Sequence, residues 1–287
     1  MADYVLSTDS TADLPADYIK EKGIVIQSLH YCFGNDVYGG DREMPVKDFY
    51  ARMRGGEMPT TNATVPDEVR VSFKKYLNEG KDILHISFSS ALSSSYSSTS
   101  FIADELRAEF PNRKIIIIDS LCASLGQGLL VHKACEKKAS GMSIEKVAKW
   151  VEENKLNLVH KFTVNDLFHL HRGGRVSKTT AIIGTLINIK PVLHVDNEGR
   201  LTSELNVRGR KKSLTTLVDE MGQLIDGFDN DIVFISHGDC VDDANYVADL
   251  IRERYKINNF IINYVGPTIG AHSGPGTVAL FFMGKKR

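Results

Sequence analysis

The sequence predicts an α/β protein with two domains, and three features carry this prediction. Residues 114–119 (KIIIID) form a continuous apolar run, which is typical of a central parallel strand covered on both faces. Expected strands and helices alternate through the first half of the chain, and this alternation favours a parallel sheet. The second half mixes hairpin and crossover connections. We therefore expect an N-terminal parallel-sheet α/β domain followed by a C-terminal α+β domain with a mixed sheet.

The first half is expected to contain strands that end in polar loops, with helices between them. Apolar clustering predicts strands at residues 4–8, 24–33, 83–88 and 114–119. Apolar residues at helical spacing predict helices at residues 45–54, 67–77, 123–139 and 143–154. Residues 34–36 (GND) predict a hairpin turn. Residues 59–66 lie between two prolines, and we expect an irregular polar loop there.

The pattern changes around residues 156–165, so we place the domain boundary near residue 160. The expected domains are residues 1–160 and residues 161–287. The turn at residues 197–199 (NEG) predicts a hairpin between two strands of the second domain. The strands of this domain are expected at residues 192–195, 201–207, 231–237, 260–265 and 277–283. Its helices are expected at residues 166–171, in an apolar segment that ends at 186–188, at 211–225 and at 242–255. Residues 266–276 are expected to form a glycine-rich turn.

Composition excludes several classes of function. The 287 residues include 35 basic and 36 acidic side chains, so no global field draws the chain to nucleic acid or to an anionic membrane. The four cysteines are scattered without metal-ligand spacing, which favours reduced thiols in a cytoplasm and no metal site. No run approaches the roughly 18 apolar residues of a membrane span. We therefore expect a cytoplasmic protein that is neither secreted nor embedded in a membrane.

The most informative stretch is the serine-rich segment 89–100 (SSALSSSYSSTS). It lies between the strand predicted at 83–88 and a helix predicted by apolar spacing in 96–110. The first N–H groups of a helix lack partners within the helix, so this turn favours an anionic ligand, and the serine hydroxyls can add donors. The alternative is that Ser93 or Ser94 simply caps the helix.

Other candidate binding residues lie in three further segments. The hydroxyls of Thr60 and Thr61 either bind a ligand or serve turn formation. His272 is flanked by glycines that let the backbone approach a ligand closely. Arg175 either contacts a ligand or is a charge at a helix C-terminus. The basic run 208–212 (RGRKK) is either a solvated face or a docking patch. The phosphate-loop, dinucleotide and GxSxG motifs are all missing from the sequence.

Taken together, these segments resemble the DegV family in order and spacing over essentially the whole chain. The segments that carry the resemblance are Asp9–Pro15, Thr60–Asn62, Ser89–Tyr96, Ile118–Ser120, Gly173–Lys178, Ile189–Pro191 and Ala271–Gly274. The resemblance implies a two-domain bacterial protein that holds one long-chain fatty acid, such as palmitate, stearate or oleate, in a tunnel between its domains. It also implies a binding subunit of fatty acid kinase, which presents the acid to a separate ATP-using kinase subunit that forms the acyl phosphate.

The resemblance implies roles for individual residues. It places the carboxylate of the fatty acid against Thr61, Ser93 and His272, with Arg175 in the surrounding polar network. Two further network positions depart from the usual family pattern. Many relatives read Thr-Ser-Gln-Pro where this chain has Thr61-Asn62-Ala63-Thr64, and a glycine commonly stands at the position of Ser94.

The remaining expectations concern partners and chemistry. Arg208 matches a basic position that the family uses toward the kinase subunit. The resemblance implies no cofactor and no catalytic residue on this chain, and it allows transient contact with a membrane surface. Two alternatives stay open: an acyl-ester hydrolase that uses Ser93 as nucleophile and His272 as base, and a lipid-sensing regulatory protein with the same pocket.

Overall fold

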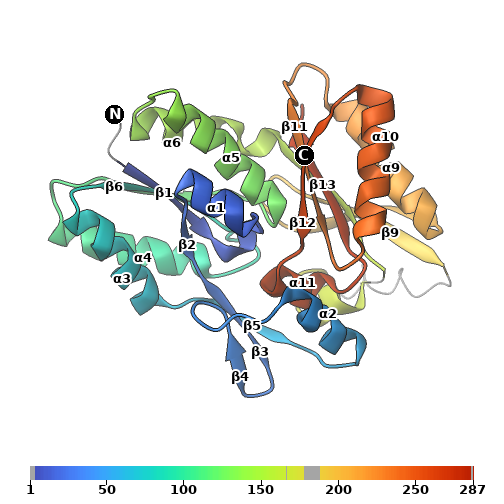
Figure 1. Ribbon diagram of the computed structural model, residues 1–287, viewed down its shortest axis with the longest axis horizontal. Helices are drawn as coiled ribbons and strands as arrows, with labels where there is room; N and C mark the ends of the chain where they lie inside the picture. Colours follow the sequence, from blue (N-terminus) through green and yellow to red (C-terminus); the bar gives the residue numbers. More distant parts are fainter. Residues whose placement is uncertain (1–3, 166, 178–187, 286) are drawn as a thin grey trace.

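The first sheet is parallel, as the sequence predicts. The structure, a computed structural model, describes residues 4–165, 167–177, 188–285 and 287. The sheet has the order β2-β1-β6-β7 with every neighbouring pair parallel (Figure 1). Its strands are β1 (Tyr4–Asp9), β2 (Val25–Gln27), β6 (Asp82–Ser87) and β7 (Ile115–Asp119).

Helices cover both faces of this sheet because its strands are apolar on both sides. Val5 and Ile83 pack on one side with α3 (Pro66–Asn78) and α4 (Ser95–Glu109), while Leu84 packs on the other. The helices on that other side are α5 (Leu125–Ala139) and α6 (Ile144–Asn154), and α1 (Ala16–Lys22) lies nearby. This two-sided burial explains why the strands read as continuous apolar runs.

The second sheet is mixed, again as predicted. Its order is β10-β9-β8-β13-β11-β12, and the pair β11–β12 is parallel while the other pairs are antiparallel. The strands are β8 (Leu158–Thr163), β9 (Ile189–Val195), β10 (Leu201–Arg208), β11 (Ile232–His237), β12 (Asn259–Tyr264) and β13 (Val278–Met283). Helices α9 (Arg210–Leu224) and α10 (Val241–Tyr255) pack on the outer face (Figure 1).

The two sheets share one continuous core, and α5 lies between them. This helix packs against β1 and β6 of the first sheet and against β8, β11 and β13 of the second. The largest hydrophobic cluster accordingly joins Leu84 and Ile118 to Phe234 and Phe281. A hydrogen bond from the Ser89 hydroxyl to the carbonyl of Gly199, 2.8 Å long, adds a polar link between the halves. The division at residue 160 stays a prediction, and that residue lies within β8.

A small antiparallel sheet corrects two predictions. The strand expected at 24–33 is interrupted at Ser28: β2 joins the parallel sheet, whereas β3 (Leu29–Phe33) joins β4 (Asp36–Tyr38) and β5 (Thr60–Thr64). The irregular loop expected at 59–66 therefore contains a strand. Its polar sequence concealed this strand because β5 is largely accessible to solvent and is held by pairing with β3. Helix α2 (Val46–Arg54) follows the hairpin as expected.

The glycine-rich segment 266–276 also differs from the prediction, because it contains the helix α11 (Pro267–Ser273). Pro267 is suited to the first turn of a helix, and the chain leaves the helix at Gly274, whose φ is +80°. Gly270 serves close packing, since a Cβ atom there would lie 2.6 Å from the Tyr50 hydroxyl oxygen. The short helix expected at 166–171 is α7 (Phe168–Arg172). The apolar helix expected before residue 188, and Lys178, lie outside the described residues.

Candidate functional site

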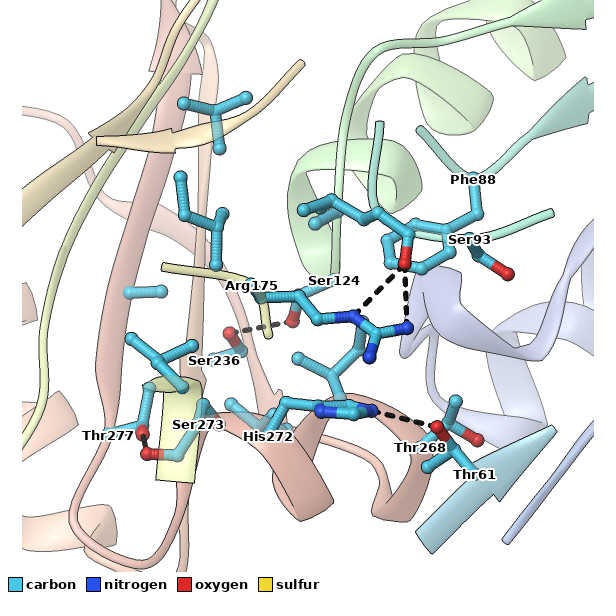
Figure 2. A pocket seen from close by; sticks show the side chains of 18 of the residues that line it. Thr61, Phe88, Ser93, Ser124, Arg175, Ser236, Thr268, His272, Ser273 and Thr277 are labelled. Atoms are coloured by element: carbon cyan, nitrogen blue, oxygen red, sulfur yellow. Dashed lines mark hydrogen bonds between the residues drawn. The ribbon is translucent and has the colours of Figure 1, made fainter. Parts of the chain in front are cut away.

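A cavity of about 340 Å³ lies between the two sheets (Figure 2). This volume falls in the range of roughly 300–1,000 Å³ that is typical of small-molecule sites. Much of its wall is apolar, and the apolar part includes Phe88, Leu92, Phe162, Leu201 and Phe281. The cavity also brings together every residue that the sequence proposed for the head group and its network: Thr61, Asn62, Ser93, Ser94, Arg175 and His272.

Strand register explains one wall of the cavity. Ala279 of β13 is paired with Phe162 of β8 on one side and with Ser236 of β11 on the other. Phe281 is two residues further along β13 and faces the same way, opposite His160. The inner face of the second sheet is therefore largely aromatic and aliphatic, with single polar side chains set into it.

Thr61 and His272 meet at one end of the cavity. The Thr61 hydroxyl lies 2.8 Å from Nε2 of His272, so β5 and α11 are joined by a hydrogen bond. Burial, with added repulsion from Arg175 and Arg172, lowers the pKa of His272 to about 4. The imidazole is therefore neutral at neutral pH. Its Nδ1 is buried and has no hydrogen-bond partner among the described residues.

Gly173 supports the His272 ring. A Cβ atom at residue 173 would lie 2.0 Å from Nδ1 of His272, a distance that no relaxed structure tolerates. The backbone of Gly173 has ordinary right-handed torsions, so the requirement for glycine here is one of space. We expect Gly173→Ala to displace the ring, break the Thr61–His272 hydrogen bond and destabilise the fold by about 1–3 kcal/mol.

Thermal unfolding of Gly173→Ala measures this effect, and Gly174→Ala is a control of a different kind. Gly174 has a φ of +72° but no atom near its missing Cβ, so that substitution introduces backbone strain without moving His272. The proposed role of Gly173 in positioning His272 is wrong if the imidazole resonances of His272 are unchanged in Gly173→Ala.

Arg175 joins the two halves of the molecule and places a positive charge at the cavity. Its Nε and Nη2 donate to the carbonyl of Leu92, at 3.2 and 3.0 Å, and Nη1 donates to the carbonyl of Gly173. Burial lowers the pKa of the guanidinium. Among the described residues, no carboxylate lies within ion-pair distance of Arg175. The cavity therefore holds a positive charge that an anion can compensate.

Ser93 contributes both to the start of α4 and to the cavity wall. Its hydroxyl oxygen accepts a hydrogen bond from the backbone N–H of Ser95 at 3.2 Å, which organises the start of α4, and it also lines the cavity. The Ser93 and Ser95 hydroxyls lie 2.9 Å apart. Ser94 occupies the N-cap position without a side-chain cap bond. Asn62 is exposed at the edge of the cavity, where its amide lies 3.9 Å from the sulfur of Cys32.

Arg208 does not join these residues. It is exposed near the end of β10 and does not line the cavity. The structure instead adds lining residues that the sequence reasoning missed, among them Ser124 and Ser236. One signal could have indicated Ser124: it follows the carboxyl end of the parallel strand β7, the edge where open α/β sheets place ligands. Nothing in the sequence pairs it with Ser236.

The geometry does not form a nucleophile–base pair from Ser93 and His272. The bond from His272 Nε2 goes to Thr61, and the bond of Ser93 goes to Ser95. Within the described part of the chain, no acid orients Nδ1 of the histidine. The described residues also contain no cluster of three potential metal ligands. None of the described helices combines the length and apolar character needed to cross a bilayer.

Comparison with known sequences finds relatives along the whole chain. The family model described as "Uncharacterised protein, DegV family" matches residues 5–285. A DegV domain-containing protein of Clostridium perfringens is 43% identical over 286 residues, covering 99% of this chain and 98% of that protein.

Comparison with solved structures finds the same architecture. A DegV family protein from Thermus thermophilus, described by its fatty acid binding, has a TM-score of 0.87 and 28% identity, covering 98% of this chain and 99% of that chain. DegV from Bacillus subtilis, described as a fatty acid binding protein, has a TM-score of 0.84 and 27% identity, covering 99% of this chain and 100% of that chain.

Proposed function

Because this chain belongs to the DegV family, we propose that it binds one long-chain fatty acid in the cavity between its two sheets. The observation that carries the proposal is the combination of an apolar cavity with the uncompensated charge of Arg175 at its polar part. A fatty acid has the matching chemistry, a long apolar tail with one anionic head. The fatty acid binding described for the relatives from Thermus thermophilus and Bacillus subtilis supports the same ligand class.

The carboxylate is proposed to contact Thr61, Ser93 and His272. The hydroxyls of Thr61 and Ser93 can turn from their present partners to donate to the carboxylate oxygens. Hydrogen bonds to a charged group are the strong ones, so they fix where the head lies. Arg175 supplies the nearby positive charge, and Asn62 and Ser94 complete the surrounding polar network.

The tail dominates the affinity in this proposal. Each buried CH₂ contributes ~0.8 kcal/mol, so a chain of roughly fifteen carbons offers ~12 kcal/mol before the costs of ordering and association. The wall formed by the inner face of the second sheet and by Phe88 and Leu92 receives this tail. Palmitate, stearate and oleate are ligands of the proposed length.

The bound acid is proposed to be presented to a separate kinase subunit in the cytoplasm. The carboxylate oxygen then acts as nucleophile toward ATP held by the partner, so this chain performs no bond chemistry and needs no cofactor. Arg208 is exposed on β10, where it is accessible to such a partner. The domains carrying the two sides of the cavity are proposed to be residues 1–160 and 161–287.

Removing both hydroxyls tests the head-group assignment. We expect the variant Thr61→Ala/Ser93→Ala to bind stearate about 10-fold more weakly, because the tail contacts remain while hydrogen bonds worth about 1.5 kcal/mol are lost. The fold should survive, and Ser97→Ala, on the exposed side of α4, is the matched control. Wild-type binding and wild-type phosphorylation of the acid by the kinase subunit in the double variant would show the assignment to be wrong.

Identification of the natural ligand tests the function directly. Purified protein is extracted with organic solvent and the released compounds are identified by mass spectrometry, with a long-chain fatty acid as the expected result. Incubation of the pure protein with acyl esters is the companion experiment. Turnover of an ester without a partner would overturn the carrier proposal.

A further inference from the structure

Two serines in the cavity wall have no part in the head-group assignment. Ser124, immediately before α5, and Ser236, on β11, both line the cavity (Figure 2). Their hydroxyl oxygens lie 2.9 Å apart, so the pair spans the seam between the two sheets. Ser236 is fully buried and Ser124 is 4% exposed. In the second sheet Ser236 lies between Ala279 of β13 and Asn263 of β12.

The hydrogen-bonded chain continues from Ser124 to a buried carboxyl group. Ser124 Oγ lies 2.5 Å from Oδ2 of Asp13, and the backbone N–H of Gly266 bonds the same carboxyl group. The side chain of Asn263 holds the backbone carbonyl of Asp13 at 2.8 Å. Burial raises the pKa of Asp13 to about 7, so both the ionised and the protonated forms of its carboxyl group are populated near neutral pH.

The hydrogen-bonded chain Asp13–Ser124–Ser236 ends at the cavity, where Ser236 can make one more hydrogen bond. A serine hydroxyl has one hydrogen and two lone pairs. With Asp13 ionised, Ser124 donates to the carboxylate and Ser236 donates to Ser124, which leaves the lone pairs of Ser236 free. With Asp13 protonated, the chain runs in the opposite direction and the hydrogen of Ser236 is free. In both states Ser236 can make one more hydrogen bond.

A third hydroxyl in the same cavity is unpartnered. Ser273 is 6% exposed and lines the cavity, and its Oγ has no hydrogen-bond partner among the described residues. Buried polar groups are normally paired, since an unpaired one loses its hydrogen bonds to water without replacement. A wholly apolar tail would leave the Ser273 hydroxyl without a partner and would not use the one further hydrogen bond that Ser236 can make.

The backbone at Ser124 has an unusual conformation. Its φ of +53° and ψ of −147° lie in a region that residues with a side chain rarely adopt. This conformation directs the Ser124 hydroxyl toward both Asp13 and Ser236. The Ser124–Asp13 hydrogen bond by itself would hold the two segments together. An alanine at residue 236 would fit an apolar wall without adding a hydroxyl.

We propose that Ser236, supported by Ser124 and Asp13 and assisted by Ser273, recognises an oxygen substituent on the acyl chain, so that the site accepts hydroxy or oxo fatty acids. The inference rests on the proposed fatty acid binding and narrows its ligand class. A hydroxyl carried along the tail would lose its hydrogen bonds to water in a purely apolar tunnel. In this cavity the substituent can form a hydrogen bond with Ser236 in place of water.

Affinity measurements with a positional series test this inference. Stearate is compared with stearates that carry one hydroxyl at different carbons along the chain, by calorimetry on the wild-type protein. We expect one position to bind at least as tightly as stearate, while the other positions bind more weakly. In Ser236→Ala, that favoured isomer should lose about 5- to 30-fold in affinity, with stearate changing less than about 2-fold.

A matched control is Ser213→Ala, which removes another buried hydroxyl, one that donates to the carbonyl of Arg210 within α9. It should alter none of the ratios. If every hydroxylated isomer binds more weakly than stearate, or if Ser236→Ala leaves the ratio unchanged, an ordered water satisfies these hydroxyls and the inference is wrong. If stearate and all its isomers fail to bind, the proposed fatty acid function itself fails, so the two failures are distinguishable.

Discussion

Arg175→Glu should weaken fatty acid binding by at least about 30-fold. The substitution replaces the uncompensated positive charge of the cavity with a negative one beside the proposed carboxylate, and changes of this kind at partly buried charge pairs cost about 2–5 kcal/mol. It also removes the guanidinium bonds to the carbonyl of Leu92, which loosens the serine-rich turn. Titration with stearate at constant ionic strength measures the loss.

Two comparisons isolate the charge from other effects. Arg200→Glu makes the same change on the exposed hairpin between β9 and β10 and should leave binding unchanged. Arg175→Lys keeps the charge without the two bonds to the Leu92 carbonyl, so it should bind with intermediate affinity. Equal binding by Arg175→Glu and the wild type would mean that the carboxylate lies elsewhere.

Ala279→Phe should exclude long tails while still admitting short acids. Ala279 lies on the cavity floor between Phe162 and Ser236, so a phenyl ring there fills the path of the tail. Losing contacts to about five methylene groups, at ~0.8 kcal/mol each, corresponds to roughly a 1,000-fold loss for stearate. A ten-carbon acid that ends before the ring should lose little. Affinities over a chain-length series measure this shift.

The stability of this variant has to be followed in the same experiment. Adding volume to a packed strand commonly costs about 1–3 kcal/mol, so thermal unfolding without ligand is measured beside binding. Ala279→Ser is the control, because it adds one small atom to the same position. A parallel loss of affinity for all chain lengths would place the tail somewhere other than along β13.

The parts of the fold that the sequence predicted well are those with local signals. Residues 114–119 form a parallel strand because both faces of that sheet are covered, and this burial is visible as an uninterrupted apolar run. The strand β5 could not be predicted, since its mostly polar residues resemble a loop and pairing with β3 holds it in place. Helix α11 was concealed by its glycine-rich sequence, in which Gly270 serves close packing against α2.

The residues of the candidate site also differ in whether the sequence carries a local signal for them. The place of Ser93 and Thr61 in the cavity wall could be predicted because their segments have an unusual concentration of hydroxyls beside expected strands and because the whole chain resembles a known family. The place of Ser124 and Ser236 could not, since each is an ordinary serine in sequence. Their relation to each other and to Asp13 arises only where α5 packs between the two sheets.

One fatty acid is proposed to lie in this cavity with its carboxylate at Thr61, Ser93 and His272. A crystal structure of the protein with stearate shows whether it does. We expect carboxylate oxygens within hydrogen-bond distance of the Thr61 and Ser93 hydroxyls, and a tail running past Ala279 and Phe281 along the inner face of the second sheet. A carboxylate at the opposite end of the cavity, or a tail outside it, would show this placement to be wrong.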